Sequence, residues 1–168
     1  MKALKIFFIL LILSSGIAKA QFTKAELQVS GLTCALCAKS TEKSLRALPF
    51  ISEVKPDLMR NIFVITFKIG QPVNFDEISK KVQDAGFFVN SFKATFNFDN
   101  VKLANNYFSY GGDTFNVVNG ADKPLSGQVT VTIVDKGFAP RSVSKKYLAL
   151  VTAAAAPANA GRVYHVAI

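Results

Sequence analysis

The sequence contains no tryptophan, a single histidine (His165) and only two cysteines among its 168 residues. It also lacks a Ser-His-Asp set, a paired-carboxylate motif and a glycine-rich phosphate loop, so nothing in it supports hydrolase or nucleotide chemistry. We therefore expect a protein that is not an enzyme, with no catalytic residues and no organic cofactor. A structural zinc ion takes four ligands, which two cysteines do not supply.

Long apolar runs are equally scarce, and the one that stands out is at the N-terminus. MKALK is basic, IFFILLILSSGI is apolar, and AKA ends in small residues at Ala20. This pattern predicts a signal peptide over residues 1–20, with the mature chain beginning at Gln21 and exported to the periplasm or secreted. The run is short for a transmembrane helix, and no cysteine lies at the cleavage point to carry a lipid. We expect no stable membrane insertion.

Positive charge is in mild excess, with 20 lysine and arginine residues against 11 aspartate and glutamate residues. Removal of the three leader lysines lowers the formal net charge from +9 to +6. The remaining basic residues are scattered along an exported chain, whereas a nucleic-acid footprint clusters them on one face. The charge therefore indicates a solvated basic surface, and we expect no nucleic-acid partner.

The hydrophobic pattern between residues 22 and 98 predicts six elements. Alternation and β-branched or aromatic residues predict strands at 22–30, 51–58, 61–69 and 88–98, while a 3.6-residue period predicts helices at 35–48 and 74–86. Asn74 with Glu77 three residues later is typical of a helix start, and Pro56 favours an edge strand. The order β-α-β-β-α-β predicts an α+β fold, a ferredoxin-like sandwich over residues 21–98.

The pattern of residues 99–168 predicts a small β-rich module of unknown role, for which docking a partner is one interpretation. The segment GQVTVTIVD (127–135) indicates a strand, PRSVSKKYLALV (140–151) a short helix, TAAAAPANAG (152–161) a loop and RVYHVAI (162–168) a closing strand. The sequence leaves open whether this module packs on the first domain or stands apart.

Both cysteines, Cys34 and Cys37, lie where the first predicted strand turns into the first helix. Gly31 allows a tight turn, Thr33 could cap the helix, and the helix N-terminus favours thiolate over thiol. A disulfide that closes so short a loop constrains the unfolded chain little, so the pair is expected to have a chemical role. Two thiolates without a third ligand suit Cu(I) or another soft metal ion such as Hg(II).

The stretch GLTCALC (31–37) resembles the Gly-Met-Thr-Cys-x-x-Cys loop of heavy-metal-associated domains. These domains occur in copper chaperones, P-type metal ATPases and exported mercury-binding proteins, and the resemblance covers about residues 23 to 96. It implies that Cys34 and Cys37 bind the metal and that Phe87, in the Asp-Ala-Gly-Phe stretch 84–87, packs beneath the metal loop. Leu32 replaces the family's usual methionine, which anchors the loop and does not bind metal.

We therefore expect an exported protein that holds a soft metal ion for trafficking or detoxification. Its expected partners are the ion and a membrane metal transporter or another metallochaperone. Two alternatives remain: a thiol-disulfide oxidoreductase that uses the CxxC pair, or a protein-interaction module whose working half is 99–168. Ala35-Leu36 between the cysteines and the element order argue against the oxidoreductase. Neither His165 nor Met59 is expected to bind metal.

Overall fold

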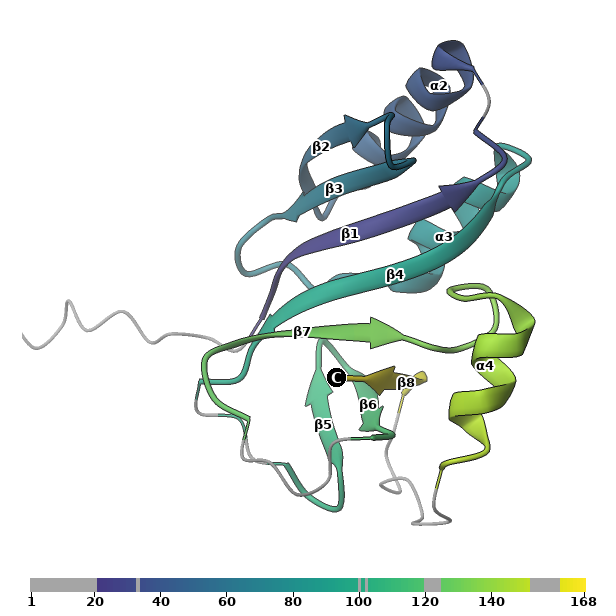
Figure 1. Cartoon of the computed structure of the whole chain (residues 1–168). Coiled ribbons are helices and arrows are strands. Elements are labelled where there is room, and N and C mark those ends of the chain that lie inside the picture. The colour runs from purple at the N-terminus through teal and green to yellow at the C-terminus, as the bar shows by residue number, and fades with distance from the viewer. Residues whose placement is uncertain (1–20, 33, 100, 102, 120–124, 152–160) are drawn as a thin grey trace, which may run out of the picture.

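The computed structural model describes residues 21–32, 34–99, 101, 103–119, 125–151 and 161–168. The predicted leader, Thr33 and most of the predicted 152–161 loop lie outside these residues. Figure 1 shows strands and helices of a mixed α+β protein. Its first six elements are β1 (Phe22–Ser30), α2 (Ala35–Arg46), β2 (Ile51–Asp57), β3 (Ile62–Phe67), α3 (Phe75–Asp84) and β4 (Phe88–Asn97).

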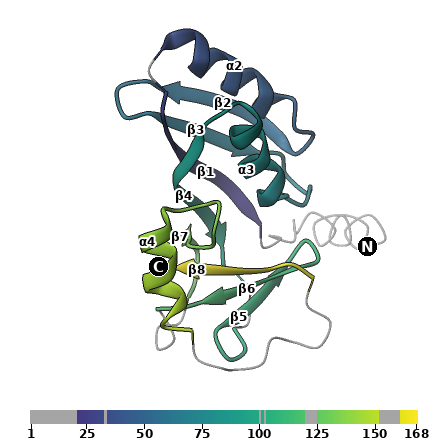
Figure 2. The same cartoon turned by 90° about the vertical axis from the view of Figure 1, so that its right-hand side faces the viewer.

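These six elements form the predicted ferredoxin-like arrangement. The strands pair in the order β2-β3-β1-β4, every pair is antiparallel, and α2 and α3 cover one face (Figure 2). β1 alternates as predicted, with Ala25, Leu27 and Val29 buried. Pro56 lies in β2 at the edge of the sheet, the part of a sheet in which proline is tolerated.

Local capping explains where α3 begins. Asn74 Oδ1 accepts the backbone N–H of Glu77 at 3.1 Å, and Asn74 Nδ2 donates to Glu77 Oε1 at 3.2 Å. Asp76 and Glu77 place negative charge in the first turn, which favours the positive end of the helix dipole. The predicted N-cap at Asn74 is confirmed.

The C-terminal part joins the same sheet. It contains β5 (Tyr107–Tyr110), β6 (Asp113–Val117), β7 (Gln128–Ile133), α4 (Arg141–Leu148) and β8 (Val163–Ala167). β7 pairs antiparallel with β4 from Phe92↔Ile133 to Asn97↔Gln128, and the full order is β2-β3-β1-β4-β7-β8-β6-β5. The question left open by the sequence is thereby answered, since the module packs on the first domain. The boundary between residues 98 and 99 stays a prediction.

A shared aromatic core also joins the two parts. The ring of Phe75, from the first turn of α3, lies 4.8 Å from Phe22, 5.5 Å from Phe92, 6.0 Å from Phe115 and 5.6 Å from Tyr164 between centroids. The first two partners belong to β1 and β4, and the last two to β6 and β8. Phe75 is fully buried, so a single side chain contacts the cores of both parts.

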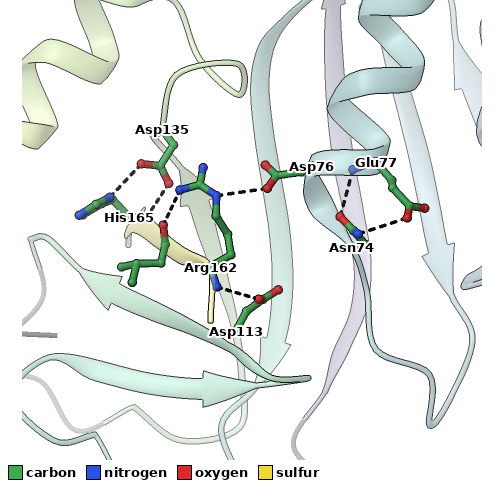
Figure 3. A network of polar contacts seen from close by, with 8 residues as sticks. Asn74, Asp76, Glu77, Asp113, Asp135, Arg162 and His165 are labelled. Carbon is green, nitrogen blue, oxygen red and sulfur yellow. Dashed lines mark hydrogen bonds and ion pairs between the residues drawn. The ribbon is translucent and has the colours of Figure 1, made fainter. Parts of the chain in front are cut away.

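Polar contacts add a second connection, drawn in Figure 3. Arg162 Nε lies 3.1 Å from Asp76 Oδ2, and the Arg162 backbone N–H donates to Asp113 Oδ1 at 3.2 Å. Burial, followed by the charges of Asp76 and Asp113, raises the pKa of Tyr164, whose ring lies 4.8 Å below the Arg162 guanidinium. The Arg162–Asp76 pair is about half exposed, and such pairs contribute about 0–1 kcal/mol, so aromatic burial dominates the connection.

We predict that Phe75→Ala lowers the free energy of unfolding by about 3–5 kcal/mol, because it leaves a cavity among rings of both parts. Urea unfolding monitored by far-UV circular dichroism measures the change. Ile69→Ala is the matched control, since Ile69 is 86% exposed and its loss should have little effect. A loss below about 1 kcal/mol at Phe75 would contradict the shared core.

Candidate metal centre

The cysteines lie in the turn from β1 into α2. Gly31 adopts φ +92°, a left-handed conformation that favours glycine, and redirects the chain after β1. Cys34 is extended and is the N-cap of α2, in place of the predicted Thr33. Cys34 Sγ accepts the backbone N–H of Cys37 at 3.1 Å, so a sulfur atom performs the capping. Cys37 lies in the first turn of the helix, as predicted.

The two sulfurs face one another at the surface. The structure joins Cys34 and Cys37 in a disulfide, with the Cα atoms 5.4 Å apart. Cys34 is exposed, Cys37 is half-buried, and the intervening Ala35 and Leu36 are exposed. The pair is therefore converging and accessible, and a reductant or another thiol can reach it from solvent.

The loop is supported from below by apolar side chains. Leu32 and Phe87 are partly buried and pack against the core. A Cβ placed on Gly31 would lie 3.4 Å from Phe87 Cδ1, which shows how closely this ring approaches the turn. The Phe87 backbone N–H donates to Val82 O at 3.1 Å, which fixes the aromatic residue after α3. Phe87 thus lies where the resemblance placed it, and Leu32 occupies the anchoring position.

No third ligand joins the cysteines within the described residues, which contain no group of three His, Cys, Asp or Glu side chains able to hold a metal ion. His165 Nδ1 lies 2.8 Å from Asp135 Oδ1, and the His165 backbone N–H donates to Asp135 Oδ2 at 2.7 Å. Met59 is 95% exposed in the turn between β2 and β3. The His165–Asp135 pair was missed by sequence reasoning, because 30 residues separate its members and neither belongs to a motif.

Among the described helices, the structure shows none with the length and apolar character needed to cross a bilayer.

Comparison with known proteins relates the segment that contains this site to one family. The family model of the heavy-metal-associated domain matches residues 26–88, a range that contains both cysteines. Residues 26–88, less than half of the chain, are therefore similar to a heavy-metal-associated domain. They are similar to part of a probable copper-transporting ATPase, HMA5, from Arabidopsis thaliana, with 37% identity over 65 residues. That match covers 39% of this chain and only 6% of the plant protein.

Solved structures of similar segments come from several organisms. The yeast copper transporter domain Ccc2a, studied in apo and Cu(I)-loaded states, is 29% identical, with 39% of this chain and 88% of that chain covered and a TM-score of 0.35. The N-terminal soluble domains of Bacillus subtilis CopA are 26% identical, with 47% and 53% covered and a TM-score of 0.38. Oxidized MerP from Ralstonia metallidurans is 22% identical, with 43% and 96% covered and a TM-score of 0.36.

We predict that, under reducing conditions, Cys34→Ala lowers the free energy of unfolding by about 1 kcal/mol more than Cys34→Ser does. Both variants remove the disulfide, but the serine hydroxyl can still accept the Cys37 N–H that Cys34 Sγ accepts. Chemical unfolding of both variants, with fresh reductant present, isolates the capping contribution. Equal stability of the two would contradict a capping role for this side chain.

Proposed function

We propose that this protein binds a soft metal ion, Cu(I) in the first place and Hg(II) as the alternative, between the thiolates of Cys34 and Cys37, for metal trafficking or detoxification. The observation that carries the proposal is the exposed, converging cysteine pair at the β1–α2 turn, inside the segment matched by the heavy-metal-associated family. Thiolates select soft ions, and a two-ligand site suits ions that accept near-linear coordination.

The chemistry requires the reduced pair. The disulfide must first accept two electrons and two protons from a thiol or another reductant, after which the ion replaces the protons on the two sulfurs. The Cys37 N–H, which now donates to Cys34 Sγ, would stabilise a negative charge on that sulfur. Two features, the helix N-terminus and the open surface, therefore favour binding at the same place.

Transfer follows from the low coordination number. An incoming thiolate from a membrane metal transporter or another metallochaperone can form a third bond to the ion before a bond to Cys34 or Cys37 breaks. The exposed Cys34 and Leu36 leave this approach open. The protein carries the ion as cargo and does not convert it, so the function involves no chemical turnover.

For Cu(I), we predict one tight equivalent per reduced protein in competition with a chromophoric chelator. Cys34→Ser and Cys37→Ser should each lose this binding, since one thiolate remains, while circular dichroism shows the fold retained. Met59→Leu is the matched control, because this thioether is fully exposed and should not affect affinity. Tight binding retained by the double cysteine variant would refute the site.

Export is part of the proposal, on the basis of the basic, apolar and small-residue pattern of residues 1–20. We predict that mass spectrometry of the exported protein finds Gln21 at the N-terminus. Substitution of both Ala18 and Ala20 by leucine should leave the leader attached, because cleavage requires small residues there. An intact leader on the unmodified exported protein would contradict this prediction.

A thiol-disulfide oxidoreductase is the second candidate, and the observed disulfide between accessible cysteines favours it. An insulin-reduction assay with dithiothreitol as electron donor separates the two functions. The metal-binding function predicts a rate equal to that of dithiothreitol alone. Catalysed reduction that disappears in Cys34→Ser would instead establish the redox role.

A further inference from the structure

A pocket of about 510 Å³ lies between the heavy-metal-associated domain and the C-terminal part. One wall comes from the end of β1, the end of α3 and the start of β4, with Ser30, Gln83, Phe88 and Asn90. The other wall is the connection from β7 into α4, residues 136–141 apart from Phe138. The pocket therefore exists only because β7 pairs with β4 and brings this connection beside α3.

Hydrogen bonds hold the two walls together. Ser79 Oγ, on α3, donates to Gly137 O at 2.8 Å, and Gln83 Nε2 donates to Ser79 Oγ at 2.9 Å. Gly137 adopts φ +96°, and a Cβ there would lie 3.4 Å from Ser79 Oγ. These contacts fix the β7–α4 connection against α3, so the pocket is formed without a ligand.

The charge of the pocket is positive. Lys136 and Arg141 line it, both are exposed, and neither forms an ion pair with any carboxylate of the described residues. The nearest carboxylate in sequence, Asp135, is engaged by His165. The helix that follows, α4, contains Arg141, Lys145 and Lys146 and no acidic residue. A bound anion would meet two cations that have no competing partner.

The pocket also presents apolar surface. Phe88 is 73% exposed, although it follows the partly buried Phe87 directly, and Val89 and Pro140 line the pocket beside it. Covering an exposed aromatic ring with an apolar group is favourable, because it removes apolar surface from water. The volume lies within the range of about 300–1,000 Å³ that small-molecule sites occupy.

We propose that this pocket binds a small organic anion that carries an aromatic or aliphatic group. The anionic group contacts Lys136 and Arg141, the apolar group covers Phe88, and the Gln83 and Asn90 amides border the ligand. Ser30 directly precedes Gly31 of the metal loop and Phe88 directly follows Phe87, so the ligand lies at the border of that loop. The site does not require that the cysteines hold a metal ion.

The probe for this test is 1-anilinonaphthalene-8-sulfonate, which combines a sulfonate with aromatic rings and fluoresces when bound. It is titrated against the full chain in the disulfide form. The double variant Lys136→Gln/Arg141→Gln should bind it at least about tenfold more weakly, the loss expected for charge-assisted contacts. Lys145→Gln/Lys146→Gln removes the same amount of charge from α4, outside the pocket, and the affinity of this control should change less than about twofold.

A second pair of variants tests the apolar wall. Phe88→Ser should weaken binding of the same probe several-fold, while Ile69→Ser, at an exposed apolar residue outside the pocket, should not. Circular dichroism confirms that each variant is folded. The proposal is overturned if the probe does not bind, or if Lys136→Gln/Arg141→Gln and Lys145→Gln/Lys146→Gln lose affinity for it equally. It is also overturned if the neutral analogue N-phenyl-1-naphthylamine binds as tightly as the sulfonate.

Discussion

Strand β4 is hydrogen bonded along both of its edges, to β1 on one side and to β7 on the other, and the rest of the molecule depends on this double pairing. Its inward side chains Phe92, Ala94 and Phe96 are fully buried, as is Phe75 of α3 above them. Because a central strand cannot shift register without exposing its apolar face, β4 fixes both parts relative to one another. The two parts therefore form one sheet with one aromatic core.

This rigid base explains how a short loop can present two sulfurs. β1 ends beside the start of β4, where Ser30 pairs with Phe88, and the chain leaves the sheet at Gly31. Phe87 and Leu32 support the turn from the core side, and α2 begins immediately at Cys34. The position of the sulfurs is thus set by the end of β1 on one side of the loop and by the start of α2 on the other. The short loop between them therefore has little conformational freedom.

The C-terminal part contributes a pocket wall that the segment matched by the heavy-metal-associated family, residues 26–88, does not supply. The β7–α4 connection places Lys136 and Arg141 across from Phe88, near the cysteine end of the domain. In Figure 1 this connection and the start of β4 lie at the same end of the sheet. One end of the molecule therefore carries the cysteine pair and a preformed basic pocket, and the C-terminal part supplies the basic wall of that pocket.

The sequence alone determined the features that depend on neighbours in the chain. The order β-α-β-β-α-β, the Asn74 cap, the edge position of the Pro56 strand and the location of the CxxC pair at a strand-to-helix turn all follow from periodicity and local hydrogen bonding. The tertiary structure decided which strands meet, as in the β4–β7 pairing and the parallel β6–β8 pairing. It also decided which distant side chains meet, as in the Asp135–His165 and Arg162–Asp76 contacts. The physical reason is that hydrophobic alternation indicates which face of a strand is buried but does not identify the strand with which it pairs. Pairings between distant segments are chosen only when the whole core packs.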